Sequence, residues 1–303
     1  SNVTFRGISF TGGRGLAVNM KGGENNQLSN CDIHLFEQSA VSITGDESKN
    51  NGLDSCAIYN CGAGAITLRG GLKESVTPAG NYVKNSVMHD VSMMREVYAP
   101  GVDVDGVGNV ISHNEFYNSP HQMILFHGVE NVMEYNKFHN VCKNAADMGV
   151  IYTGRNVADQ GNLIRYNHFY NVGTGFASNF APCCIFTDDG SSNLEAYGNV
   201  FGPNVTSVEV IKIHGGIYNR FHHNLYIDAP EAYYQSGWNK GHWYNMVIGD
   251  SEPALRDSFL AVKDNPLYLE KWPWLRQLKD TSGSPSTIVY EELPNQLYEN
   301  VLL

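Results

Sequence analysis

A chain of 303 residues with 42% hydrophobic residues, 17% charged residues and 31 glycines is too apolar to be disordered and indicates an ordered fold with many turns. Its formal net charge of -11 argues against nucleic acid as a partner, because phosphate backbones are bound through lysine and arginine. No apolar run approaches the roughly 18 residues that span a membrane, so we expect no membrane span. The chain begins inside a repeat at residues 1–4, and we expect a mature or partial chain whose first coils are missing.

Six short strands along the chain share one pattern, in which apolar residues alternate with polar ones and a glycine follows. Period-two alternation is the signature of a strand, and the glycine marks a corner. The six segments are 41–45, 66–70, 102–106, 124–128, 150–154 and 211–215.

A second motif, Asn-x-Phe-x-Asn, recurs between these strands at 114–118, 136–140 and 167–171. Phe116 and Phe138 are 22 residues apart, and longer steps elsewhere indicate loops inserted into a coil. Two strands and their turns in such a period leave no room for a helix, and no apolar stripe of helical period is present. We therefore predict an all-β fold, a right-handed parallel β-helix of about nine coils, over residues 1–249.

The asparagines of the motif have a physical role in such a stack. Asparagine tolerates the left-handed backbone of a tight corner, and in successive coils its amide can form a ladder that satisfies buried polar groups. Cys31 and Cys56 occupy the ladder position of neighbouring coils, where either a disulfide or two stacked thiols is compatible with a spacing of about 4.8 Å. No Cys-x-x-Cys pair occurs, so we expect no metal site, and no cofactor is indicated.

The sequons at Asn2 and Asn204 are compatible with glycosylation. Together with the predicted fold, they favour a secreted glycoprotein.

Candidate functional residues gather on the outer face of the middle coils. The predicted register gives an outward column just before the glycine corner, and Asp147, Asp188, Asp189 and His121 join the same face. The column consists of Thr44, Arg69, Asp105, His127, Thr153, Thr187 and His214.

Two carboxylates on neighbouring coils are the apparatus of glycoside hydrolysis, and they must lie roughly 5 to 9.5 Å apart. Asp147 lies five positions before Tyr152, and Asp188 lies two positions after Phe186, with both aromatic residues expected to point inward. On a straight strand this offset is roughly 20 Å. The pair can act together only if the corner at Gly149 or an inserted loop folds the chain across the groove.

The middle of the chain resembles a family of secreted right-handed β-helix proteins with the pectin lyase-like fold, which includes glycoside hydrolase family 141. The resemblance rests on segments 119–122, 134–136, 147–155, 161–167, 188–190 and 197–199. It implies hydrolysis of a plant- or algal-type polysaccharide, with α-L-fucosidase and xylanase activities known in the family. It assigns Asp147 and Asp188 as the catalytic carboxylates. The residues that it implies for binding the sugar are His121, Tyr152, Arg155, Asp189, His214 and Trp238, and we add His127 from the outward column.

The chain departs from the family pattern close to this site. Asn144 stands where an acidic residue is usual, Ala146 where Asp is frequent, and Asn156-Val157 where Asp-Trp is common. A non-catalytic glycan-binding or extracellular structural β-helix protein is therefore the second hypothesis. A polysaccharide lyase is the third, and it is weaker because only Asp103 and Asp105 alternate onto one face as calcium ligands would. In each case the expected partner is a polysaccharide or glycan, and self-association is left open.

The chain changes character from about residue 250, where the repeats stop and prolines become frequent. We predict that residues 250–303 form an irregular segment of short helical turns and loops that packs against the stack. Trp272 and Trp274 are expected to pack in this segment and not to bind sugar.

Overall fold

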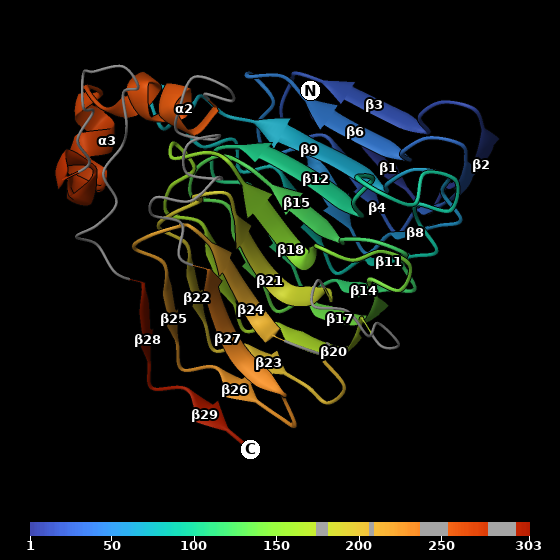
Figure 1. The fold of residues 1–303 in the computed structure, drawn as a ribbon. Helices are drawn as coiled ribbons and strands as arrows, with labels where there is room; N and C mark the ends of the chain where they lie inside the picture. The colour runs from blue at the N-terminus through green and yellow to red at the C-terminus, as the bar shows by residue number, and fades with distance from the viewer. Residues whose placement is uncertain (174–180, 206–208, 237–253, 278–294) are drawn as a thin grey trace.

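The computed structural model describes residues 1–173, 181–205, 209–236, 254–277 and 295–303. In these residues the chain winds into a right-handed parallel β-helix, with its N-terminal coils at the top of Figure 1 and its C-terminal coils at the bottom. The coils form three parallel sheets, here called A, B and C, of ten, ten and nine strands in the described part. The predicted fold class is confirmed.

Sheets A and B consist mostly of three-residue strands in strict order along the chain. Sheet A contains β1 (Thr4–Arg6), β4 (Gln27–Ser29), β7 (Gly52–Asp54), β10 (Tyr82–Lys84), β13 (Val110–Ser112), β16 (Val132–Glu134), β19 (Leu163–Arg165), β22 (Glu195–Tyr197), β25 (Arg220–His222) and β28 (Gln296–Tyr298). Sheet B contains β2 (Ser9–Gly13), β5 (Asp32–Phe36), β8 (Ala57–Tyr59), β11 (Val87–His89), β14 (Glu115–Tyr117), β17 (Lys137–Val141), β20 (His168–Val172), β23 (Val200–Phe201), β26 (Leu225–Tyr226) and β29 (Val301–Leu302).

Sheet C has longer strands and carries the candidate site on its outer face. It contains β3 (Val18–Lys21), β6 (Val41–Thr44), β9 (Ile66–Gly70), β12 (Val102–Gly106), β15 (Ile124–Phe126), β18 (Gly149–Gly154), β21 (Cys183–Asp188), β24 (Glu209–His214) and β27 (Glu231–Ser236).

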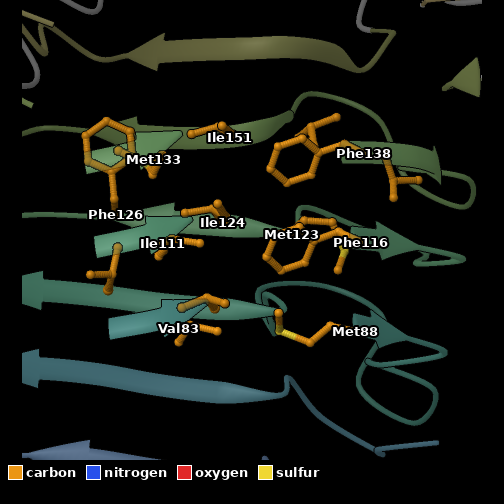
Figure 2. Close-up of a cluster of buried hydrophobic side chains, with 14 of the residues drawn as sticks. Val83, Met88, Ile111, Phe116, Met123, Ile124, Phe126, Met133, Phe138 and Ile151 are labelled. Atoms are coloured by element: carbon orange, nitrogen blue, oxygen red, sulfur yellow. The ribbon is translucent and has the colours of Figure 1, made fainter. Parts of the chain in front are cut away.

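The core is one continuous column in which like side chains stack from coil to coil. Phe116 and Phe138 stack with their ring centroids 4.9 Å apart, and Phe169 follows at 4.8 Å. Figure 2 shows this layering, with Val83, Ile111 and Met133 above one another beside the column of aromatic rings. The predicted stacking of the Asn-x-Phe-x-Asn motif is confirmed, because the same inward position recurs in every coil.

Two asparagine ladders run along the stack. In the predicted ladder, each asparagine donates from its backbone N–H to the side-chain oxygen of the next one, from Asn114 through Asn136, Asn167, Asn199 and Asn224 to Asn300. The second ladder, at the start of the sheet A strands, was not anticipated and includes Asn26, Asn51, Asn81, Asn109, Asn131, Asn162, Asn219 and Asn295.

Glycine corners after sheet C are required by close backbone contact. Gly128 has φ +101°, and a Cβ atom there would lie 2.0 Å from the carbonyl oxygen of Gly106. Only glycine fits both this backbone angle and this approach.

The outer face of sheet C differs from the prediction by one residue in the middle coils. The sequence pattern aligns Gly154 with Gly128, whereas the register places Gly154 level with His127. Because side chains alternate between the faces of a strand, a one-residue shift exchanges inside and outside. Thr153 and Thr187 are therefore buried, 3% and 0% exposed, and their predicted place in the outward column is wrong.

The described helices of the C-terminal segment pack against the corners that follow sheet C. It contains α2 (Ala254–Val262), α3 (Pro266–Lys271) and the 3-10 helix η1 (Pro273–Gln277), which lie beside the stack in Figure 1. Trp272 and Trp274 are buried in a second apolar cluster with corner residues such as Val157. The chain then returns to the stack, where β28 and β29 pair with β25 and β26 and extend sheets A and B, which the sequence analysis did not anticipate.

All six cysteines are buried free thiols. Of the two predicted possibilities for Cys31 and Cys56, the structure therefore has the pair of thiols and not the disulfide. Within the described ranges, no helix has the length and apolar character needed to cross a membrane.

Candidate functional site

A pocket of about 590 Å³ lies on the outer face of sheet C, over strands β18, β21, β24 and β27. Its walls include five acidic side chains, which outnumber the basic ones. They are Asp147, Asp188, Asp189, Glu209 and Glu231. The pocket thus lies on the face that the sequence indicated.

Asp188, at the end of β21, is a carboxylate that lines this pocket and is held by neighbouring side chains. Its Oδ2 accepts a hydrogen bond of 2.7 Å from the Tyr152 hydroxyl, and its Oδ1 lies 2.9 Å from Nδ1 of His214. Its side chain is 16% exposed. Asp188 is therefore oriented by two donors and is still open to a ligand.

Asp189 lies behind Asp188 with its side chain 4% exposed. Its oxygens lie 2.5 Å from Nε of Arg155 and 3.0 Å from Nδ1 of His214. Burial by itself would raise the pKa of Asp189, but these hydrogen bonds and charges outweigh it and lower the pKa. Asp189 is thus an ionised anchor that fixes the positions of Arg155 and His214.

His214 joins the two carboxylates. Burial by itself would lower the pKa of His214, but the hydrogen bonds and charges of Asp188 and Asp189 outweigh it and raise the pKa to about 9. Burial, together with the charge of Asp188, also raises the pKa of Tyr152 far above its usual range. Both groups are therefore protonated near neutral pH and act as donors.

The same three side chains have the donor atoms of a metal site, since one ligand atom from each of Asp188, Asp189 and His214 lies within 4.8 Å of the others. A metal ligand must be a neutral imidazole, whereas His214 is held as a cation, and Arg155 already neutralises Asp189. A divalent cation at these atoms would have to displace the proton of His214 and compete with Arg155 for Asp189.

Asp147 lines the pocket from its opposite end. It precedes β18 by two residues, has φ 55° and is 65% exposed, and its Oδ1 lies 3.8 Å from Nζ of Lys212. Asp188 is level with Gly154, so seven residues of chain, about 23 Å if extended, separate the levels of the two aspartates. The structure therefore brings Asp188, not Asp147, together with Tyr152, Arg155 and His214.

The remaining predicted residues lie elsewhere. His121 is 4% exposed, and burial lowers its pKa to about 4. His127 is three coils from His214, with its Nδ1 2.8 Å from the buried carboxylate of Asp159. Trp238 lies outside the described residues.

Several pocket residues were missed by the sequence analysis. Lys212 extends over the ring of Phe186, 5.0 Å from its centroid, and pairs with the buried Glu209 at 3.5 Å. Tyr98 and Tyr234 contribute exposed rings to the wall. Lys212 alternates with the apolar residues of β24 and could have been found from that pattern, whereas Tyr98 lies in a loop that carries no periodic signal.

The departures from the family pattern have structural roles. Asn144 donates a hydrogen bond to Glu96, and Asn156 donates one to Asp159. Val157 is buried against the C-terminal helices, where its amide donates to the hydroxyl of Ser258. The position that carries an aromatic residue in the family thus serves packing in this chain.

Comparisons with known proteins support the fold. The profile of the family described as "Right handed beta helix region" matches residues 1–94. No curated protein matches the sequence. Among solved structures, the crystal structure of an alginate lyase from Paenibacillus sp. strain FPU-7 is similar with a TM-score of 0.56 and 16% sequence identity, over 76% of this chain and 78% of that chain. At this identity the likeness shows the fold alone, and the resemblance to glycoside hydrolase family 141 stays a prediction.

Proposed function

We propose that this chain is a glycoside hydrolase that cleaves a polysaccharide bound in the pocket on sheet C, with Asp188 at the reacting centre. The observation that carries the proposal is the geometry of Asp188, which is held by Tyr152 and His214 and is open to the pocket. Glycosidases need a fixed carboxylate as base or nucleophile beside the scissile bond.

The buried Asp189 acts in this proposal as a positioning residue, and Asp147 is the proposed acid. Its exposed side chain can reach a leaving-group oxygen in the pocket, and protonation of that oxygen is the second requirement of hydrolysis. The extended chain between the levels of Asp147 and Asp188 spans about 23 Å, whereas paired carboxylates act at about 5 to 9.5 Å, so Asp147 can serve as the acid only if its end of the pocket moves toward Asp188 when substrate binds. This requirement makes Asp147 the part of the proposal that variant kinetics test most directly.

Hydrolysis is favoured over elimination by the charges of the site. A lyase needs a base, but the raised pKa values of Tyr152 and His214 keep both protonated near neutral pH. A lyase also needs a cation for the uronate carboxylate, whereas Arg155 is paired with Asp189 and Lys212 with Glu209. The excess of acidic side chains in the wall favours a neutral glycan over a polyuronate.

The test is an assay of the full chain on xylan, on aryl α-L-fucosides and on alginate, with both reducing ends and new carbon–carbon double bonds measured. We expect release of reducing ends without double bonds. Asp188→Asn should lower kcat by about 100-fold to 10,000-fold. Asp103→Asn is the matched control, because Asp103 lies on the same outer face outside the pocket and pairs with Arg69.

The outcomes separate the three classes. Formation of double bonds would identify a lyase and contradict the proposal. If a polysaccharide in a native gel slows the migration of the protein, and the protein turns over no substrate, the protein is a glycan-binding protein. Loss of activity in Asp188→Asn but not in Asp147→Asn would assign the acid to another residue.

We also propose that the protein acts outside the cell, where polysaccharides are found. The proposal is supported by the sequons at Asn2 and Asn204, whose side chains lie on the surface. Mass analysis of the protein from its native source, before and after enzymatic deglycosylation, tests this location.

A further inference from the structure

Tyr98 stands out among the exposed residues near the pocket. It lies in the loop between β11 and β12, is 65% exposed and has φ 50°. The left-handed backbone is unfavourable for an L-residue, and an exposed ring recovers little of this cost by burial. Such a backbone outlier beside a pocket points to a functional role.

Other tyrosines with positive φ have a structural explanation that Tyr98 lacks. Tyr135, with φ 53° and 49% exposed, belongs to a column of corner residues and stacks between the rings of His113 and Tyr166 at 4.8 and 5.0 Å. Tyr98 belongs to no such column. Its described ring contact is with the buried His121, 5.5 Å away at a tilt of 49°.

Tyr98 lines the pocket that also contains the candidate catalytic carboxylate, Asp188. Tyr152 lines the same pocket, and the phenol of Tyr98 is near enough to that of Tyr152 to contribute to the raised pKa of Tyr152.

The other aromatic rings in the inner part of the pocket are already covered. Phe186 is 2% exposed, lies under the ammonium group of Lys212 and meets the ring of Tyr152 edge-on at 5.5 Å. Among the described residues that line the pocket, Tyr98 has the most exposed aromatic ring, 65% against 43% for Tyr234.

We infer that Tyr98 is a stacking platform that binds a pyranose ring of the substrate in the pocket that contains Asp188, an inference that rests on the proposed function. The face of a pyranose carries C–H groups, which bury apolar surface against an aromatic ring while the hydroxyl groups remain hydrated. The contact with His121 fixes the plane of the Tyr98 ring before a sugar binds, and this lowers the conformational entropy that is lost on binding.

The test measures binding separately from hydrolysis. In the Asp188→Asn background, Tyr98→Ala, Tyr98→Phe and Tyr135→Ala are compared by affinity electrophoresis in gels containing xylan or alginate. Tyr135→Ala is the matched control, since it removes an exposed tyrosine with the same backbone geometry outside the pocket. Thermal denaturation of each variant checks that the fold is kept.

We expect Tyr98→Ala to weaken retardation by xylan about tenfold, and Tyr98→Phe and Tyr135→Ala to change it less than twofold. Equal retardation of Tyr98→Ala and its parent would overturn the inference and leave the proposed function standing. An equal loss in Tyr135→Ala would also overturn it, because the effect would then not be specific to the pocket. If neither polysaccharide retards the parent and the unmodified chain hydrolyses no glycan, the proposed function fails and the inference fails with it.

Discussion

At the scale of single residues, the site depends on one imidazolium between two carboxylates. His214 has a folded-state pKa of about 9, whereas an unfolded histidine titrates near 6.5. A group whose pKa is raised on folding stabilises the protein fully below the unfolded pKa, and the contribution is lost as the pH rises through the folded pKa. The stabilising effect of His214 should therefore be present at pH 6 and absent at pH 9.5.

The measurement is urea denaturation of the unmodified protein and of His214→Gln at several pH values. The difference in free energy of unfolding should shrink between about pH 6.5 and pH 9, by about 1–2 kcal/mol once solvent screening of the partly exposed ring is allowed for. A difference that does not change with pH would contradict the assignment of His214 as a cation.

Three buried hydroxyl groups lie directly beneath the site. Thr153, Thr187 and Ser191 line a cavity of about 10 Å³, and none of the three makes a hydrogen bond within the described part of the chain. A polar cavity of this size suits one water molecule with two to four partners. We expect such a water to tie the end of β21, next to Asp188, to the neighbouring coil.

Thr187→Val tests this expectation, because valine keeps the shape and removes one partner of the water. The free energy of unfolding in urea should fall by about 1 kcal/mol. A stabilising effect would contradict the expectation, since removing an unsatisfied buried hydroxyl from a dry cavity is favourable. Thr67→Val, on the outer face of sheet C, is the matched control.

The register of the strands in sheet C determined how much of the site could be predicted from the sequence. Asp188, Asp189 and His214 were found because a charged pair after an apolar strand is visible in the sequence. The resemblance placed Tyr152 in the same site, but the predicted register turned its side chain inward, because Gly154 was aligned with Gly128. Alternation alone cannot detect such a shift when threonines occupy both faces.

At the scale of elements, the asparagine ladders replace the regular hydrogen bonds that corners lack. Asn136 is 2% exposed; its amide donates to the Ile111 carbonyl at 2.9 Å and to Asn167 at 3.1 Å, and its oxygen accepts from Asn114 at 3.0 Å. Removing it leaves several buried polar groups unpaired at once.

We therefore expect Asn136→Ala to lower the free energy of unfolding by about 2–4 kcal/mol in urea denaturation. Asn19→Ala, on the exposed edge strand β3, should change it by less than about 0.5 kcal/mol. Equal effects at the two positions would show that the ladder contributes no more than any surface asparagine.

The elements themselves were the most predictable part of the fold. Like side chains stack on one another, so Phe116, Phe138 and Phe169 occupy the same position of successive coils. This repetition can be recognised in a single sequence without an alignment. The last strands were missed because Gln296 follows Ser236 by 60 residues and breaks the period. Asn295 and Asn300 nevertheless carry the ladder signal there.

At the scale of the whole molecule, the chain joins a repeat stack to a segment that has its own apolar cluster. In a solenoid each coil contacts its neighbours, so stability is distributed locally along the axis. The helices α2, α3 and η1 instead pack across the corners of several coils through Trp274, Leu255 and Phe259. The segment therefore links coils that are not adjacent in the stack.

Trp274→Ala tests this link. Trp274 is 4% exposed and its indole donates a hydrogen bond of 3.1 Å to Gln160, so its truncation should weaken the docking of the segment by about 3–5 kcal/mol. Hydrogen exchange should accelerate in residues 254–277 and at the corners near Val129 and Val157, and stay unchanged in the first coils. Leu267→Ala, at an exposed position of α3, is the control. Uniform acceleration along the chain would contradict a local role, because it would mean that the segment and the stack unfold as one cooperative unit.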